Sequence, residues 1–201
     1  MYEKPPDNSV QQINNLQDKE VPVIDTNAEA VIFSKIKHDQ NLSLFQKILL
    51  TTDGTVTNLL QLATKESIKV KKIEQEIYLS GENETYLCPV NTPVLRRNII
   101  LCSETKNYLY AESLFIFENL SRSTQYKLLE TDLPIGLLWK KEKLESLRQI
   151  IDFKVEECGF LAPYFDLDPT SPIYSRSYLI SNKLKPLGII TEKFPASFFK
   201  E

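Results

Sequence analysis

The chain has 201 residues, of which 42% are hydrophobic and 25% charged, a composition typical of a globular protein with one domain. Its net charge is −3, so the basic surface expected of a nucleic-acid-binding protein is missing, and no apolar run is long enough to span a membrane. One histidine, three cysteines without a C-x-x-C pair and five glycines give no support to a multi-histidine metal site, a zinc cluster or a glycine-rich nucleotide loop. His38 lies in a polar stretch, and we assign it no role.

The N-terminal segment 1–26 contains prolines, several Asn and Gln residues and scattered charges, but few large apolar side chains. Such a composition predicts a flexible polar tail, and residues 27–201 are then expected to form the folded domain. A transit peptide is rich in Arg and poor in acidic residues, whereas the first Arg of this chain is Arg96 and the tail is partly acidic. We therefore expect no transit peptide.

The overall amino-acid usage also has a strong bias. Leu, Ile, Lys and Asn are abundant, whereas Gly, Ala and Arg are scarce. This bias follows AT-rich codons and indicates a gene in an AT-rich genome, such as that of an organelle. We expect an organelle-encoded protein of the plastid stroma, or a cytoplasmic protein if the gene lies elsewhere.

The first predicted elements follow residue 40. Apolar residues recur at helical spacing over 42–49, pause at Asp53–Gly54 and resume over 56–62, which predicts two short helices joined by a turn. Over 68–77 the period changes to two, with a phase slip that is typical of a strand with a bulge.

The middle of the chain predicts a hairpin and then helices. Two β-rich runs, Val94–Cys102 and Asn107–Phe117, are separated by four polar residues and should pair as antiparallel strands. The pattern then favours a short helix over 123–130, a compact apolar connection over 133–139 and a further helix over 140–147.

The C-terminal third is predicted to be mostly β-structure. Residues 150–158 alternate, with Ile151, Phe153 and Val155 expected on one face. A proline-rich loop precedes a second hairpin formed by Tyr174–Ile180 and Pro186–Phe194. About six strands with helices inserted between hairpins predict an α+β domain with one antiparallel sheet.

Two charged residues fall among apolar neighbours on their strand faces. Arg97 shares a face with Leu95, Ile99 and Leu101, and Glu192 shares one with Ile190 and other apolar residues. Unpaired charges are rarely buried because desolvation is costly, so both groups need partners. Two interpretations stay open: a buried ion pair between Arg97 and Glu192, or a pocket in which Arg97 binds a ligand carboxylate and Glu192 meets a polar group at its far end.

Four motifs in this order and spacing resemble the chorismate pyruvate-lyase (4-hydroxybenzoate synthase) family, especially its cyanobacterial and algal-plastid branch. The resemblance covers about residues 41–198, and its motifs are Leu95–Cys102 followed by a hairpin, Leu133–Gly136, Arg176–Leu179 and Pro186–Pro195. It implies a six-stranded antiparallel sheet with helical flaps that close an internal pocket.

The resemblance also implies roles for particular residues. Arg97 matches the arginine that binds the ring carboxylate, and Glu192 matches the glutamate that meets the ring hydroxyl. Backbone amides near Thr55 and at Ile135 match two further carboxylate ligands. Arg148 and Arg176 match other family arginines and are candidates for the mouth of the pocket.

Those two arginines differ in their surroundings. Arg148 is expected on a strand face with Asp152 and Lys154, which favours a solvated charge or one at the pocket mouth, whereas the role of Arg176 stays open.

The implied reaction is elimination of pyruvate from chorismate, which leaves 4-hydroxybenzoate, a precursor of prenylated quinones. No metal or organic cofactor is implied, and isochorismate stays open as a substrate. The same fold serves as the effector-binding domain of some bacterial regulators, so the alternative is a non-catalytic sensor of a small aromatic acid. The polar tail is too short for a DNA-binding helix-turn-helix domain, and we expect a monomer whose partners are small molecules.

Overall fold

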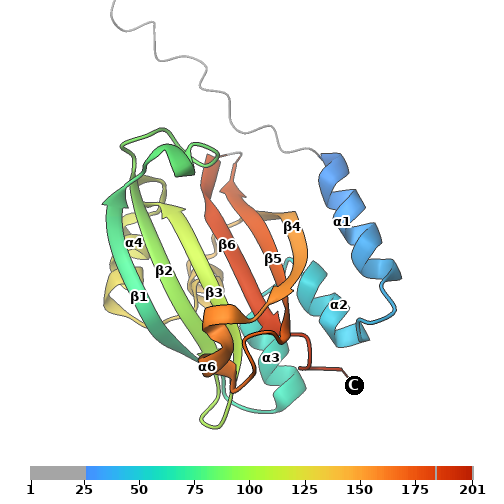
Figure 1. The fold of residues 1–201 in the computed structure, drawn as a ribbon. Helices are drawn as coiled ribbons and strands as arrows, with labels where there is room; N and C mark the ends of the chain where they lie inside the picture. Colours follow the sequence, from blue (N-terminus) through green and yellow to red (C-terminus); the bar gives the residue numbers. More distant parts are fainter. Residues whose placement is uncertain (1–25, 184, 201) are drawn as a thin grey trace, which may run out of the picture.

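The computed structural model describes residues 26–183 and 185–200, which form one antiparallel sheet with helices packed on it (Figure 1). The strands are β1 (Lys69–Leu79), β2 (Pro93–Cys102), β3 (Asn107–Ile116), β4 (Leu147–Glu157), β5 (Pro172–Asn182) and β6 (Lys185–Pro195). Their order in the sheet is β1-β2-β3-β6-β5-β4. The predicted α+β class, the single antiparallel sheet and both hairpins are therefore confirmed.

The helices divide between the two faces of the sheet. They are α1 (Thr26–His38), α2 (Leu44–Thr51), α3 (Val56–Thr64), α4 (Arg122–Glu130), α5 (Ile135–Glu142) and α6 (Ala162–Phe165), with 3-10 turns at Glu82–Glu84, Phe117–Asn119 and Gly159–Leu161. Apolar residues of α1 to α5 and of the inner sheet face form the main core. The short α6 packs against Ile100, Tyr110 and Ile173 on the outer face (Figure 1). None of the described helices is long and apolar enough to cross a membrane.

The two predicted flap helices are confirmed as α2 and α3. A capping box begins α2, in which Ser43 Oγ accepts a hydrogen bond from the Gln46 amide (3.1 Å) and Gln46 Oε1 accepts one from the Ser43 amide (3.0 Å). The buried Gln46 side chain also donates to the carbonyl of Ala196 (3.0 Å). This contact ties α2 to the segment that follows β6.

The predictions for residues 133–139 and 140–147 were wrong. The expected connection over 133–139 and helix over 140–147 are replaced by α5, in which Ile135, Leu138 and Trp139 are buried at helical spacing. The helix ends at Lys143, whose φ of 53° is left-handed. The helical spacing of these residues falls within a short apolar run, and such a run is equally compatible with a connection that has no regular structure.

Helix α1 was not predicted. Its main buried apolar side chain is Ile36, and it is held at the β4 edge by polar contacts. Glu29 accepts a hydrogen bond from the Ile150 amide (3.2 Å), and Lys35 lies over the Phe153 ring. Such contacts leave little hydrophobic periodicity in a sequence. The tail expected at 1–26 lies, apart from Thr26, outside the described residues.

The predicted face of β4, with Ile151, Phe153 and Val155 together, was wrong because the strand contains a bulge. The register with β5 shifts between Ile150 and Asp152, so Ile150 and Phe153 are buried whereas Ile151 is exposed. The same shift places Arg148 on the inner face with Ile150 and Phe153, instead of with Asp152 as predicted. The alternation of apolar residues alone could not show where the extra residue lies.

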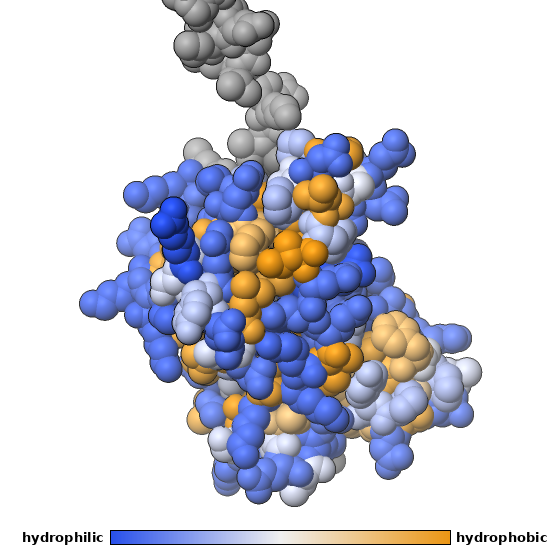
Figure 2. Space-filling view, turned by 90° about the vertical axis from the view of Figure 1, so that its left-hand side faces the viewer, coloured by the Kyte–Doolittle hydropathy of each residue, from blue (hydrophilic) through white to orange (hydrophobic). Residues whose placement is uncertain are grey.

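One of the two edge strands of the sheet is β1, and Figure 2 views the molecule from that side. This surface is mainly hydrophilic with an interrupted run of hydrophobic side chains, and β1 carries Lys69, Lys71 and Lys72 at one end and the exposed Ile77 and Leu79 at the other. Charged side chains on an edge strand oppose pairing with the edge of another molecule. The predicted bulge of this strand is confirmed, between Lys72 and Glu74.

Gly188 allows β6 to approach β3. A Cβ atom at this position would lie 2.4 Å from the Leu114 carbonyl oxygen and 2.9 Å from the Phe115 Cα. We expect Gly188→Ala to lower the free energy of unfolding by about 3 kcal/mol, because the backbone atoms have no room to move aside. Chemical denaturation measures this loss, and Gly81→Ala is the control because its Cβ would meet nothing closer than 3.6 Å.

Candidate functional site

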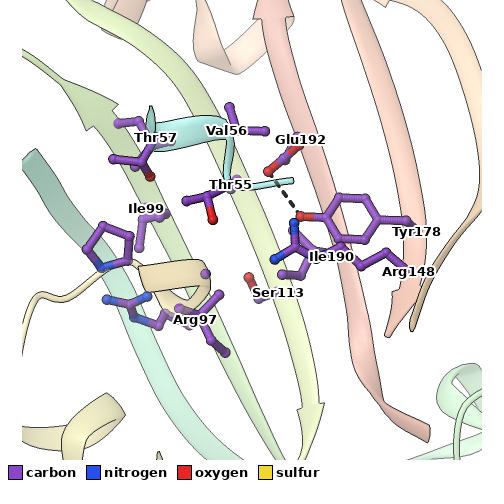
Figure 3. A pocket seen from close by; sticks show the side chains of 15 residues that line it. Thr55, Val56, Thr57, Arg97, Ile99, Ser113, Arg148, Tyr178, Ile190 and Glu192 are labelled. Carbon is purple, nitrogen blue, oxygen red and sulfur yellow. Dashed lines mark hydrogen bonds between the residues drawn. The ribbon is translucent and has the colours of Figure 1, made fainter. Parts of the chain in front are cut away.

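A pocket lies on the inner face of the sheet, beneath the first turns of α3 and α5. Its walls are largely apolar, with Ile99, Leu101, Ala111 and Ile190 contributed by β2, β3 and β6. Figure 3 shows Arg97 and Glu192 on opposite sides of this space. The two charges that the strand faces predicted therefore line one cavity.

Arg97 is held in the pocket by the register of β2. It pairs with Ser113 of β3, and only 2% of it is exposed. One Nη2 hydrogen bond reaches the Leu133 carbonyl (3.3 Å), and Nε has no hydrogen-bond partner among the described residues. Burial lowers the pKa of Arg97, an effect that the charge of Asp132 opposes, but a guanidinium group remains charged in proteins.

No carboxylate in the described ranges forms an ion pair with Arg97. The interpretation of a buried ion pair between Arg97 and Glu192 is therefore wrong. Burying a cation without a counter-ion is costly, and such a group favours an anion that enters from outside.

Two helix N-termini add to the positive potential near Arg97. The pocket is lined by Thr55, the N-cap of α3, and by Pro134 and Ile135 at the start of α5. The first N–H groups of a helix have no partner inside the helix, and the helix dipole is positive at this end. Together with the guanidinium group, these amides suit a carboxylate ligand.

Glu192, at the other end, is held by two side chains of β5. It is 7% exposed, and its Oε2 accepts a hydrogen bond from Arg176 Nε (2.9 Å), with Nη2 of the same group 2.8 Å away. Its Oε1 accepts a hydrogen bond from the Tyr178 hydroxyl (3.1 Å), drawn in Figure 3. Burial, together with the charge of Glu192, raises the pKa of Tyr178, so this hydroxyl stays a donor.

The two other predicted arginines occupy different places. Arg176 is 1% exposed and lies behind Glu192, so the expectation that it is at the pocket mouth was wrong. The β5–β6 register places it directly opposite Glu192. Arg148 is half-buried and lines the pocket, where its Nη1 donates a hydrogen bond to the Gly54 carbonyl.

Sequence reasoning missed three polar residues that line the pocket, Thr57, Ser113 and Tyr178. Two of them could have been found from their strand faces: Ser113 shares a face with Ala111 and Phe115 on β3, and Tyr178 lies two residues from Arg176 on β5. In the part of the chain that the structure describes, no group of three or more His, Cys, Asp or Glu residues could hold a metal ion. The pocket thus offers a cationic end, an apolar middle and an acceptor end.

Comparison with known proteins places this chain in a family. A family model described as Rv2949c-like chorismate pyruvate-lyase matches residues 50–200. The chain belongs to this family. It is 30% identical to the uncharacterized protein ycf21 of Cyanophora paradoxa, over 83% of this chain and 84% of that protein. It is also 25% identical to the chorismate pyruvate-lyase of Mycobacterium tuberculosis, over 77% of this chain and 81% of the enzyme.

Solved structures with the same fold include a protein of Mycobacterium smegmatis, PhnF. The likeness to PhnF has a TM-score of 0.58 at 11% identity and covers 72% of this chain and 64% of that chain. Its effector domain alone matches with a TM-score of 0.57 at 11% identity, over 71% of this chain and 88% of the domain. At this identity the likeness establishes the fold alone, and the function has to be inferred from the residues of the site.

Proposed function

We propose that this protein is a chorismate pyruvate-lyase that converts chorismate to 4-hydroxybenzoate and pyruvate. The observation that supports this most strongly is the pocket itself, in which Arg97 has no carboxylate partner among the described residues and Glu192 stands at the opposite side. A ring with a carboxylate at one end and a hydroxyl at the other complements both ends. Membership of the family supports the same substrate class.

In this proposal the two ends hold the ring in a single orientation. Arg97, with the backbone amides of Thr55 and Ile135, binds the ring carboxylate, and Glu192 accepts a hydrogen bond from the ring hydroxyl. Arg176 and Tyr178 fix the orientation of the Glu192 carboxylate. Such a site contributes mainly by positioning in a dry cavity, an effect that can reach about 7–11 kcal/mol in well-oriented reactions.

The chemical step breaks the ether bond between the ring and the enolpyruvyl group and removes the hydrogen from the ring carbon that carries the hydroxyl. The electron pair of that C–H bond makes the ring aromatic, and the ether electrons leave with the oxygen. The hydrogen goes either directly to the methylene carbon of the departing group or, as a proton, to Glu192, in which case the released enolpyruvate takes its methyl proton from water. Chorismate deuterated at that ring position distinguishes the two routes, because direct transfer retains the label in the methyl group of pyruvate.

The first test is turnover by the unmodified protein. We expect it to release pyruvate and 4-hydroxybenzoate from chorismate without added metal, as measured by absorbance of the aromatic product and a coupled pyruvate assay. Isochorismate, tested alongside, defines the substrate. Binding of 4-hydroxybenzoate without turnover of either compound would instead favour the sensor function, to which the likeness to an effector domain is relevant.

We also propose that the product supplies prenylated quinone synthesis in a plastid, and that the protein acts as a monomer. The AT-biased amino-acid usage and the similarity to the ycf21 protein of Cyanophora paradoxa support the plastid location. The base composition of synonymous codon positions tests the organelle origin. A gel-filtration profile that depends on protein concentration would contradict the monomer.

A further inference from the structure

The turn between α2 and α3 forms a lid over the pocket. It contains Thr52, Asp53, Gly54 and Thr55, of which Thr55 lines the cavity. With this turn in place, only 2% of Arg97 and 7% of Glu192 are exposed. A ligand that reaches both groups must therefore displace a covering segment, either when it enters or when it leaves.

This lid meets the first turn of α5 with little space to spare. A Cβ atom at Gly136 would lie 3.3 Å from Thr55 Cγ2 and 3.4 Å from Arg148 Nη2. The two segments that line the carboxylate end of the pocket therefore touch at Thr55 and Gly136, and the Arg148 guanidinium lies at the same contact. Figure 3 shows the Arg148 side chain reaching toward Thr55.

Two guanidinium groups from the sheet hold the lid by its backbone. Arg148 Nη1 donates a hydrogen bond to the Gly54 carbonyl, and Arg176 Nη1 donates one to the Thr52 carbonyl (2.9 Å). The helices on either side have only 8 and 9 residues, and helices of this length are marginal without tertiary contacts. These bonds therefore bear directly on whether the turn stays closed.

The two arginines differ in how easily their hydrogen bonds to the lid can break. Arg176 is 1% exposed and is neutralised by Glu192, so its position is fixed. Arg148 is half-buried and forms no ion pair with the described residues, and its guanidinium carbon lies 5.8 Å from the centre of the Tyr178 ring. Its single lid contact can break without leaving a charge buried, because solvent can replace the carbonyl.

We propose that Arg148 is a positioning residue that latches the lid, so that its hydrogen bond to Gly54 controls how fast the pocket opens. The residue acts through the lid turn and its pocket-lining Thr55. The part of this proposal that concerns the ligand rests on the proposed function, whereas the lid contact itself does not. Loss of the bond should speed opening while the rest of the fold is unchanged.

The first experiment needs no ligand. Amide hydrogen exchange of Gly54, Asn58 and Leu59, whose amides are hydrogen-bonded within the turn and the first turn of α3, should be about tenfold faster in Arg148→Ala than in the unmodified protein, which corresponds to about 1.4 kcal/mol. Arg148→Lys, which keeps a donor, should restore part of the protection. Lys154→Gln is the matched control because it removes an exposed cation from the same strand without contact with the lid. Unchanged exchange in Arg148→Ala, with an unchanged Tm, would overturn the proposal.

The second experiment uses 4-hydroxybenzoate as the probe. The only tryptophan, Trp139, lies in α5, so its fluorescence should report binding in a stopped-flow experiment. We expect dissociation to be about tenfold faster in Arg148→Ala, with a smaller change in the association rate. A raised KM for chorismate with unchanged 4-hydroxybenzoate dissociation would contradict the latch and assign Arg148 to the substrate. If the unmodified protein does not bind 4-hydroxybenzoate, the proposed function fails, and hydrogen exchange still decides the latch.

Discussion

Arg97→Ala is expected to reduce the release of pyruvate from chorismate severely. Hydrogen bonds to a charged group contribute about 1.5–3 kcal/mol each, so loss of two such bonds to the carboxylate should lower kcat/KM by about 10²- to 10⁴-fold. Arg96→Ala is the matched control: Arg96 lies next to it on β2 but faces the other side, where it pairs with Glu76 (3.1 Å). Full activity in Arg97→Ala would remove this residue from the site.

The same position should show opposite effects on activity and on stability. Arg97 is buried and forms no ion pair with the described residues, although the charge of Asp132 acts on it, so Arg97→Met replaces a weakly compensated charge with an apolar side chain of similar length. We expect this variant to have a higher free energy of unfolding than the unmodified protein while it loses turnover. A structural arginine would show the reverse, with a large loss of stability on substitution.

Glu192→Gln is expected to lose both activity and stability. The amide keeps the shape of the side chain but leaves Arg176 buried without a counter-charge, which should cost about 3–5 kcal/mol in the free energy of unfolding. It also weakens the acceptor for the ring hydroxyl, so we expect turnover to fall at least about 100-fold, within the range typical of proton-handling or acceptor groups. Urea denaturation and the pyruvate assay measure the two effects separately.

A double variant separates these two roles of Glu192. Arg176→Gln alone should be as destabilising as Glu192→Gln, because it leaves the carboxylate buried without its cation. Combined, the two substitutions remove both charges and should recover much of the stability, but turnover should stay low. Recovery of turnover in the double variant would mean that Glu192 supports the fold and does not act on the ligand.

Strand periodicity is local, and for that reason most of the sheet could be predicted from the sequence. Alternation over 94–102 and 107–117 placed the first hairpin, and the interruption at Asp53–Gly54 separated the two flap helices. The same alternation singled out Arg97 and Glu192 as charges on apolar faces. It could not identify their partners, because the alternation within one strand does not show which residues of another strand lie beside it.

Pairing across strands was decided by bulges, which add a residue without a clear sequence signal. The shift between Ile180 and Ser181 sets the register that places Arg176 opposite Glu192. The shift after Ile150 turns Arg148 toward the pocket, and from there it can reach the lid turn. Each inserted residue moves every later side chain of its strand to the opposite face of the sheet. The positions of these two arginines therefore depended on the assembled sheet.

The sequence by itself thus determined the class of fold, the family and the two charged groups that the pocket needs, because these depend on residue type and on local spacing. Only the tertiary structure showed that Glu192 is held by Arg176 and Tyr178, and that Arg97 is left without a carboxylate partner in the described part of the chain. These properties depend on which strands lie side by side and in what register. That arrangement follows from packing of the whole chain and not from any one segment.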